Sequence, residues 1–481
     1  MTEESSEKRV GLVASLWDPV DNSSMTLFRV CFGLVMANWG WDYLASGRVT
    51  RLYVEPKFHF TYYMFDWVQP WSGSWMYIHF VVLIVTALFI AVGFFYRFSA
   101  TVFAIGFSYF FLLDMTNYQN HYYLICLIAT WLPFMPLHRN VSVDAWIRPA
   151  IRSQVAPKWA LWMLRFHVAL PYFFGGVAKL LPDWLQGEPL SQILEAKSTL
   201  PFIGPILANH SMAIVLAWSA LAFDLAIVPL LMWKRTRLIA CCLCATFHLL
   251  NSVIFNIHVF PWMMLLATPI FFEPNLPRLI LGGQALDLTT VTQQNPVYCR
   301  TLAHRIAFSM MIVYVVFHCV WPLRYRLYSG DASWTEKGHT FAWRMMLRGK
   351  TVVLGYAIQD KITGKVSDGS ISRFINAEQS DRFGRDPEMI LHFAHFLGED
   401  YRKKTGNPAS VYALVLASLN GRKPALLIDP NVDLMDQLRG FHDRPWVLPL
   451  REPLRRPTWK VPLDQWKQQV DIPELRFLKK R

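Results

Sequence analysis

Long runs of apolar residues constrain the fold of this chain more than any other feature. Nine runs lie in the first two thirds of the sequence, and several approach or exceed the length a helix needs to cross a hydrocarbon core, about 18–20 residues. Because lipid cannot satisfy backbone polar groups, such runs predict spanning helices. The candidate spans are 26–45, 75–95, 98–114, 121–137, 159–181, 208–233, 237–256, 257–273 and 302–322.

The composition agrees with a membrane protein. Hydrophobic residues make up 53% of the 481 positions, and the mean hydropathy is +0.25. The net charge of +13 could suggest a nucleic-acid partner, but many basic residues lie in short loops between the spans, where they set topology. None of the seven cysteines lies in the C-terminal third, so we expect neither a disulfide framework nor a thiolate metal site.

The loop charges predict an orientation. If the N-terminus is cytoplasmic, the inner loops hold eleven Lys and Arg and the outer loops hold four, as the positive-inside rule requires. An odd number of spans then places the residues after 322 on the outer, periplasmic or lumenal side. The seventh and eighth runs merge around Asn251 to Pro261, so one of them could be re-entrant. The segment from Val143 to Gln154 mixes Trp, Ile and Arg, which predicts a position on the membrane surface.

The C-terminal part has the pattern of a small α+β domain. Two β-rich runs, 351–366 and 410–429, are interrupted by turn signals at Thr363-Gly364 and Asn420-Gly421. Between them, 386–404 has apolar residues at helical spacing. We therefore predict an α-helical polytopic membrane domain of eight to nine spans followed by a small α+β extramembrane domain. The predicted divisions are a polar, uncleaved N-terminal segment 1–25, a membrane domain 26–322 and a soluble domain 323–481.

Polar side chains inside the spans are rare and costly, so each is a candidate functional residue. Under the predicted orientation most of them lie toward the outer side, where we place the soluble domain. These residues are Asn120, His121, Lys179, His248 and Asn251, with Lys57 and His59 in the first outer loop and Asp224 as a further intramembrane charge. A single site between the membrane and the soluble domain is the interpretation that this convergence favours.

Lys179 offers specific chemistry because it stands among apolar residues. Desolvation disfavours the ammonium, so a neutral amine can exist near pH 7 and act as a general base for a weakly acidic hydroxyl. An apolar reactant such as a quinol or a lipid would arrive from the bilayer. The sequence has no HExxH, no GxSxG and no phosphate loop that would point to a metal, serine or nucleotide mechanism.

Each candidate also has a structural interpretation. Lys179 could extend to the headgroups from the end of its span, although the preceding Gly175-Gly176 pair favours close helix packing at this point. The aromatic first outer loop could be an interfacial belt. Asn120, with His121 beside it, could cap the start of a helix. Asp224 could pair with an arginine such as Arg29 or Arg165. His248 and Asn251 could form contacts between helices.

Six blocks of sequence carry a resemblance to a known family. In chain order they are NHYYL followed by SVDAW, GGVAKLLPDWLQGEPL, FHLLNSVIFNIHVFPWMMLLATPIFF, FAWRMMLR and LIDPNVDL. This order resembles the vitamin K-dependent γ-glutamyl carboxylases, whose membrane core is shared with bacterial proteins of the horizontally transferred transmembrane (HTTM) class. The similarity extends from Leu27 to Leu450.

The resemblance implies a carbon–carbon bond-forming lyase that makes γ-carboxyglutamate. The family's base lysine matches Lys179, which would deprotonate vitamin K hydroquinone before that cofactor reacts with oxygen. The strong base that results takes a γ-proton from a glutamate side chain, carbon dioxide adds to the carbanion, and the cofactor leaves as the epoxide. The implied partners are a glutamate-containing protein or peptide and the lipid bilayer, with no nucleic acid and no metal.

The resemblance also implies roles for other residues. The family's functional Asn-His pair matches Asn120 and His121, and a further histidine near its site matches His248. Trp343 and Arg344 fall in the motif that opens the soluble domain, near where the family handles glutamate. We therefore expect His121 and Asn120 to be catalytic together with Lys179. The residues expected to bind substrate or cofactor are His248, Asn251, His59, Trp343 and Arg344.

The chain departs from the family pattern in three places. Tyr325 in PLRYRLY stands where the family commonly has a histidine, the outer loop lacks the cysteine of the animal disulfide, and nothing matches the long C-terminal extension of the animal enzymes. Two other functions therefore stay open. One is a quinol oxygenase or epoxidase that does not act on protein, and the other is a non-catalytic membrane carrier, which would need polar residues through the full membrane thickness.

Overall fold

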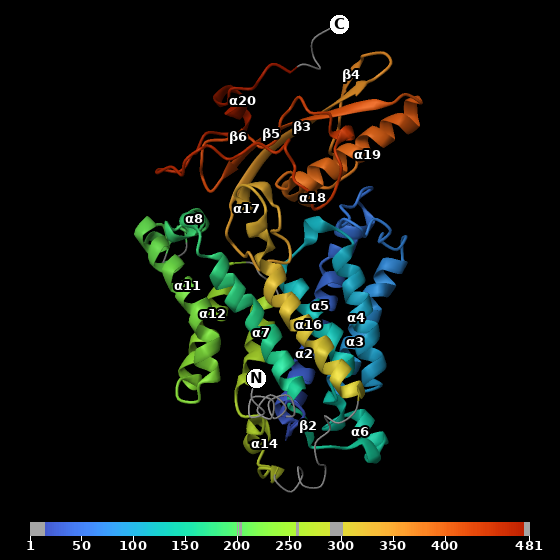
Figure 1. Cartoon of the computed structure of the whole chain (residues 1–481), viewed down its shortest axis with the longest axis vertical. Helices are drawn as coiled ribbons and strands as arrows, with labels where there is room; N and C mark the ends of the chain where they lie inside the picture. The colour runs from blue at the N-terminus through green and yellow to red at the C-terminus, as the bar shows by residue number, and fades with distance from the viewer. Residues whose placement is uncertain (1–14, 200, 202–203, 256–258, 289–301, 476–481) are drawn as a thin grey trace, which may run out of the picture.

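In the computed structural model, a helical part and a smaller part with a sheet are stacked along the long axis of the molecule (Figure 1). The structure describes residues 15–199, 201, 204–255, 259–288 and 302–475. The expectations for residues 1–14, for Cys299 and for Arg300 in the inner loops lie outside the described residues.

The main helices coincide with the apolar runs of the sequence. They are α2 (Ser23–Ala45), α3 (Trp75–Val92), α4 (Tyr96–Leu112), α5 (Asn120–Trp131), α7 (Lys158–Ala178), α11 (His210–Met232), α12 (Arg237–Ile254), α13 (Phe260–Ala267) and α16 (Leu302–Val320). Among the described residues, four segments are long and apolar enough to cross a membrane: α3, α11, α12 and Leu302–Leu327, which joins α16 to a 3₁₀ turn.

The predicted count of eight to nine spans is not confirmed. Helix α5 has 12 residues, about 18 Å, and α13 has eight, about 12 Å, against a hydrocarbon core of about 30 Å. Each gives way to a 3₁₀ turn that contains a proline, Pro133 after α5 and Pro269 after α13. Proline lacks the N–H that would continue the helix. The expectation that one of the merged runs does not span the membrane agrees with the short α13.

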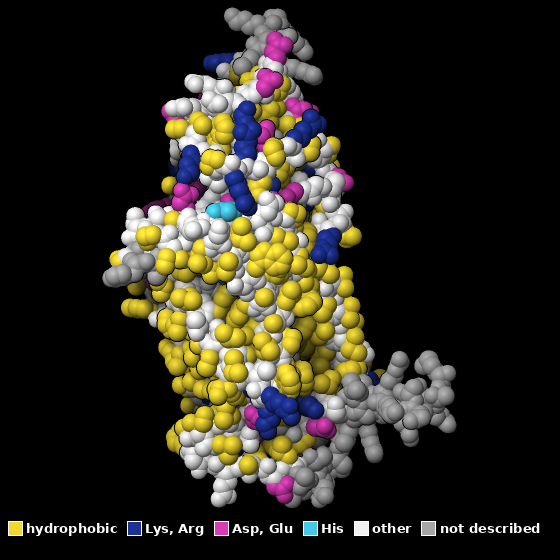
Figure 2. All heavy atoms as spheres, turned by 90° about the vertical axis from the view of Figure 1, so that its left-hand side faces the viewer, with side chains coloured by type: hydrophobic (Ala, Val, Ile, Leu, Met, Phe, Trp, Pro, Cys, Tyr) yellow, Lys and Arg dark blue, Asp and Glu magenta, His cyan; other side chains and the backbone are white. Residues whose placement is uncertain are grey.

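The outer surface of the helical part is apolar. Figure 2 shows a broad band of hydrophobic side chains over it, with charged side chains gathered above and below the band. Inside, close helix contacts rest on small residues: a Cβ on Gly33 of α2 would lie 2.5 Å from the Ala87 carbonyl oxygen of α3. An apolar belt between two charged zones is the surface of a membrane protein.

The end of the helical part farthest from the sheet holds short elements. Strands β1 (Pro19–Asp21) and β2 (Val155–Pro157) pair there, close to α6 (Val143–Ile147) and α14 (Leu276–Ile280) (Figure 1). On α6, Trp146 is 81% exposed, which fits the predicted surface segment.

Further short helices lie elsewhere in the molecule. They are α8 (Pro182–Leu185), α9 (Leu190–Glu195), α10 (Gly204–Leu207), α17 (Ala332–Thr335) and α20 (Trp466–Gln469).

The smaller part, which we call the soluble part, is an antiparallel four-stranded sheet with helices packed against it. Its order is β4 (Val366–Asp368), β3 (Lys350–Asp360), β5 (Ala409–Leu419) and β6 (Ala425–Leu426). Helices α18 (Ala377–Phe383) and α19 (Pro387–Thr405) lie in the β4-to-β5 connection, and Phe393 packs 5.6 Å from the Tyr356 ring of β3. Both predicted turns are present, and Asn420 and Gly421 have the positive φ angles that such a turn requires.

Candidate active site

Lys179 lies where α7 ends, beside the soluble part. Its backbone N–H bonds back to the Gly176 carbonyl at 3.0 Å, and its side chain is almost fully buried. The ammonium donates to Asp224 Oδ2 of α11 at 2.5 Å and lies 5.3 Å from the Trp184 ring. Lys179 therefore does not extend to the headgroups. The sequence had suggested purely apolar surroundings, but the structure places a carboxylate beside the ammonium.

The expected partner of Asp224 was wrong. Neither Arg29 nor Arg165 contacts it: Arg29 donates to the carbonyls of Leu137 and Val141, and Arg165 to those of Ile270 and Phe272. Backbone carbonyls accept the hydrogen bonds of these two arginines, and Asp224 is bonded by Lys179 instead.

The glycine pair makes the contact between Lys179 and Asp224 possible. A Cβ on Gly176 would lie 2.6 Å from Leu225 Cδ2, and one on Gly175 would lie 3.3 Å from Asp224 Oδ2. Real Cβ atoms do not approach as closely as the first distance. The predicted close packing is confirmed, and α11 approaches α7 at the position that carries the carboxylate.

The buried pair can hold its proton in two ways. An ammonium with a carboxylate and a neutral amine with a carboxylic acid have the same total charge, but burial penalises the charged form of each partner. Transfer of one proton from Lys179 to Asp224 along the 2.5 Å hydrogen bond would leave a neutral amine whose lone pair accepts the bond from the new carboxylic acid. Asp224 thus offers Lys179 a proton acceptor, whereas the sequence analysis had considered only apolar surroundings.

A second polar pair joins α7 to α12. The hydroxyl of Tyr172, seven residues before Lys179 and so on the same face of α7, is 2.6 Å from His248 Nε2 of α12. Phe260 of α13 lies 5.9 Å from the His248 ring and 5.7 Å from the His121 ring of α5. The structure therefore places the rings of His121 and His248 against the same phenylalanine, in a cluster that also includes Tyr172.

The two candidate asparagines have different surroundings. Asn120 Oδ1 accepts a hydrogen bond from Tyr118 at 2.9 Å, and the N-cap of α5 is Gln119, so the cap interpretation of Asn120 is wrong. The Tyr118 hydroxyl in turn accepts the Phe341 N–H of the soluble part at 2.7 Å. Asn251 lies half-buried one turn after His248 on α12.

A loop of the soluble part covers the site. Trp343 is 1% exposed and lies 5.1 Å from the Tyr123 ring of α5. The Cε of Met345 would be 3.1 Å from a Cβ on Gly175, next to Lys179 and Asp224. Phe341, Trp343 and Met346 all have positive φ angles, near 57°, which bulky residues rarely adopt. Such strain persists only where the surrounding structure fixes it, and it gathers at functional sites.

His59 has another position. Its Nδ1 lies 3.2 Å from Asp114 Oδ2, and the same oxygen accepts from Gln379 of α18 at 2.8 Å. The neighbouring Phe58 and Phe60 belong to the apolar core of the soluble part. His59 thus joins the first outer loop to that part, and the structure does not group it with Lys179.

The sequence missed Tyr172, Phe260 and the role of Asp224. A spacing of seven residues before Lys179 could have indicated Tyr172. Nothing local indicates Phe260, which is one of 34 phenylalanines.

Comparison with known families matches both parts of the chain. Residues 17–276, more than half of the chain, match the model of the HTTM domain. Residues 303–453 match the model described as the lumenal domain of vitamin K-dependent gamma-carboxylase. No solved structure matches the chain.

Proposed function

Because this chain belongs to the vitamin K-dependent γ-glutamyl carboxylase family, we propose that it carboxylates glutamate side chains and couples this reaction to oxygenation of vitamin K hydroquinone. The hydrogen bond between Lys179 and Asp224 beneath a loop of the soluble part is the observation that carries the proposal.

Lys179 is the proposed base. With the shared proton on Asp224, Lys179 Nζ can accept a proton from a weakly acidic hydroxyl once its lone pair turns away from the carboxylic acid. The pair then carries one positive charge, which stabilises the oxyanion left beside it in a site that excludes water.

The residues around Phe260 fit an aromatic ring. His121 and His248 lie about 6 Å from Phe260 on two helices, and the hydroxyl of Tyr172 fixes the orientation of the His248 ring. Bound hydroquinone would supply the reaction with oxygen that generates the strong base. Asn120 directly precedes His121 in sequence, and Asn251 follows His248 by three residues. Both asparagines are proposed to bind the same ring. His59 is proposed to act only through the position of the outer loop.

The glutamate substrate is proposed to approach from the soluble side, past Trp343 and Arg344. The proposal includes a cytoplasmic N-terminus, a membrane domain through residue 322 and an outer domain from 323. The family match to a lumenal domain supports this orientation. So do the positions of β2, which pairs with β1 near the N-terminus, and of the sheet, at opposite ends of the molecule (Figure 1).

The test uses purified protein in detergent with reduced vitamin K, oxygen, bicarbonate and a glutamate-rich peptide. Incorporation of labelled carbon dioxide and formation of epoxide are followed together, with Lys179→Ala alongside. We expect both products from wild type and neither from the variant. Epoxide without carboxylation across varied peptides would indicate a quinol oxygenase. Neither product from folded wild type would favour a carrier and make Lys179 a structural cation.

A further inference from the structure

A continuous chain of oxidisable side chains runs through the helical part. Its members are tryptophans and tyrosines with one histidine ring between them, and neighbouring ring centroids are 6.3 Å apart or less. In order they are Trp343, Tyr123, His318, Tyr314, Trp131, Trp159 and Trp17. The chain begins in the loop that covers the active site. It ends two residues before β1, which pairs with β2 at the end of the helical part farthest from the sheet, here called the far end (Figure 1).

The first half of the chain passes from the loop into the helices. The Trp343 ring lies 5.1 Å from the ring of Tyr123 on α5. His318 of α16 lies 6.2 Å from Tyr123 and 4.3 Å from Tyr314, which is one turn earlier on α16. Because the rate of electron transfer through protein falls steeply with distance, a series of short steps between such rings is much faster than one long step.

The second half of the chain reaches the far end. The Tyr314 ring lies 5.0 Å from Trp131 at the end of α5. Trp131 is 6.3 Å from Trp159 at the start of α7, and Trp159 is 6.2 Å from Trp17. Trp17 is only half-buried, so it can exchange an electron with a small molecule from solution.

Each tyrosine of the chain has a histidine at its hydroxyl. Tyr314 Oη is 2.7 Å from His167 Nε2 of α7, and Tyr123 Oη is 3.2 Å from His318 Nδ1. Both histidines are buried. A tyrosine that loses an electron must also give up its phenolic proton, because the oxidised phenol is a strong acid. A neutral imidazole nitrogen at hydrogen-bond distance can take that proton and later return it. The two tyrosines therefore have the partners that reversible oxidation needs.

Packing alone does not explain the two tryptophans at the far end. The indole nitrogens of Trp17 and Trp159 are buried and have no hydrogen-bond partner among the described residues. An unsatisfied buried donor costs about 1–3 kcal/mol, and a phenylalanine would bring an aromatic ring without that cost. Indole differs from the phenylalanine ring in being far more easily oxidised. The choice of tryptophan is therefore explained by electron transfer better than by burial.

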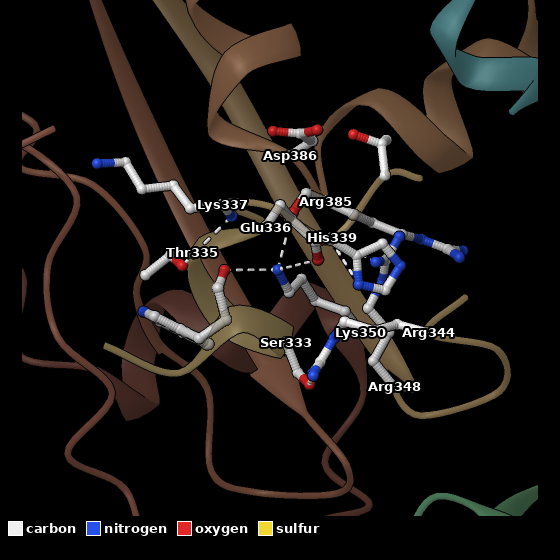
Figure 3. Close-up of polar contacts among 12 residues, drawn as sticks. Ser333, Thr335, Glu336, Lys337, His339, Arg344, Arg348, Lys350, Arg385 and Asp386 are labelled. Atoms are coloured by element: carbon white, nitrogen blue, oxygen red, sulfur yellow. Dashed lines mark hydrogen bonds and ion pairs between the residues drawn. The ribbon is translucent and has the colours of Figure 1, made fainter. Parts of the chain in front are cut away.

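The loop that carries Trp343 is held by a cluster of buried charges at its two ends (Figure 3). Glu336 precedes Trp343 by seven residues and Lys350 follows it by seven. Lys350 Nζ donates to Glu336 Oε1 at 2.7 Å, and Arg348 bonds to the other oxygen of Glu336. These ion pairs close the loop, so the first ring of the chain keeps a fixed distance from the Tyr123 ring.

We propose that this chain carries one-electron oxidising equivalents from the active-site loop to the far end. The inference rests on the proposed function for the source of the oxidant, an oxygen-derived one-electron oxidant left in the site when no glutamate side chain is present to be carboxylated. That oxidant takes an electron from Trp343, and Tyr123 replaces the electron while its phenolic proton moves to His318.

The later steps return every side chain to its reduced form. Tyr314 gives an electron to Tyr123, which recovers its proton from His318, and the proton of Tyr314 moves to His167 until Tyr314 is reduced in turn. The three far tryptophans pass the vacancy on. A small thiol in solution then reduces Trp17, is itself oxidised toward its disulfide and releases a proton to water. One electron reaches the oxidant, which takes up one proton at the site.

The first test does not depend on hydroquinone chemistry. A ruthenium photo-oxidant is attached to Met346→Cys, an exposed position three residues after Trp343, in full-length protein whose cysteines 242, 299 and 319 are changed to serine. A flash with an irreversible electron acceptor oxidises the loop. Electron paramagnetic resonance identifies the radical, and mass spectrometry locates oxidised Trp17.

The variants keep the aromatic ring or the hydrogen bond, so packing is preserved. They are Tyr314→Phe, Trp131→Phe and His167→Gln, which cannot take up the phenolic proton. Tyr43→Phe is the matched control, because the Tyr43 hydroxyl is buried but bonds Tyr122 at 2.9 Å rather than a histidine. We expect the three variants to lose most of the oxidation at Trp17, whereas the control keeps it. In Trp131→Phe the radical should stay on a tyrosine.

The second test uses unlabelled protein with hydroquinone and oxygen but no peptide. Oxidation of Trp343 and Met345, the latter to its sulfoxide, should accumulate faster in Tyr314→Phe and Trp131→Phe than in wild type or Tyr43→Phe. The initial rate of peptide carboxylation should be the same in all four proteins, because the chain takes no part in that reaction.

Two results would overturn the inference while the proposed function stands. One is oxidation of Trp17 that is absent from the labelled parent or equal in all its variants. The other is equal oxidation of Trp343 and Met345 in the unlabelled variants and the control. Wild-type protein that makes no epoxide would overturn the proposed function, and the photochemical test would then decide alone whether the chain conducts.

Discussion

Arg422 binds both carboxylate oxygens of Asp183, at 2.6 and 2.8 Å. Asp183 follows Lys179 by four residues, and Arg422 lies on the turn between β5 and β6 of the soluble part. Asn420 of the same turn donates to Asp183 at 2.8 Å. The segment that follows the proposed base is therefore held by the soluble part, so the position of Lys179 depends on how the two parts are joined.

Arg422→Gln is expected to destabilise the protein by about 3 kcal/mol, because a partly buried carboxylate loses its cation. Burial raises the pKa of Asp183, but the hydrogen bonds from Arg422 and Asn420 outweigh it and lower the pKa. A lowered folded pKa means that this stability is present above the unfolded pKa, near 4, and is lost as pH falls through the folded value. Thermal unfolding across pH should show wild type and variant converging in acid. Arg455→Gln, which removes an exposed ion pair, should leave stability unchanged, and an equal loss there would contradict the prediction.

Asp224→Asn is expected to lower the rate of epoxide formation by about 10²-fold or more, because Lys179 loses the group that takes its proton. Stability should fall by about 3–5 kcal/mol, since one charge of a buried pair is left alone. The double variant Lys179→Met with Asp224→Leu should recover stability without recovering activity. Unfolding and turnover measured on the same preparations separate the two effects. If Asp224→Asn retains full turnover, the carboxylate takes no part in the chemistry.

Gly176→Ala is expected to destabilise the helical part by about 1–3 kcal/mol, because the added Cβ would lie 2.6 Å from Leu225 and force α7 away from α11. Gly355→Ala is the matched control, since a Cβ on that strand position meets nothing within 4 Å. Thermal unfolding measures both. Epoxide formation should fall with Gly176→Ala alone, as the distance between Lys179 and Asp224 grows. Equal stability of the two variants would contradict the close contact.

Asp386→Asn is expected to change how stability depends on pH. Burial, with the charge of Glu336, raises the pKa of Asp386 to about 6. The folded state then keeps a proton that the unfolded state releases near pH 4, so stability is lost as pH rises from about 4 to 6. Relative to wild type, the asparagine variant should gain up to about 3 kcal/mol between pH 4 and 7. Asparagine can still accept the Glu388 N–H at the start of α19. If the difference in the free energy of unfolding between the variant and wild type did not change with pH, the prediction would be contradicted.

Local signals in the sequence predicted much of this architecture. Apolar runs located the helices because burial in lipid acts on every residue of a run. The Thr363-Gly364 and Asn420-Gly421 pairs located two turns because those backbone angles favour Gly and Asn. The Gly175-Gly176 pair located a close helix contact, since only the absence of a Cβ permits it. The span count was less certain because proline ends α5 and α13 early.

The sequence by itself thus determined the family of the protein, most of its helices and both turns. Tertiary structure alone decided the partners: Asp224 bonds Lys179 across 45 positions, His248 bonds Tyr172 across 76, and Arg422 bonds Asp183 across 239. It also left two nitrogens of Arg344 without a partner among the described residues. The physical reason is that a local pattern specifies backbone conformation and burial. Which charge meets which depends on how the helices and the sheet pack, and that is settled only when the whole chain has folded.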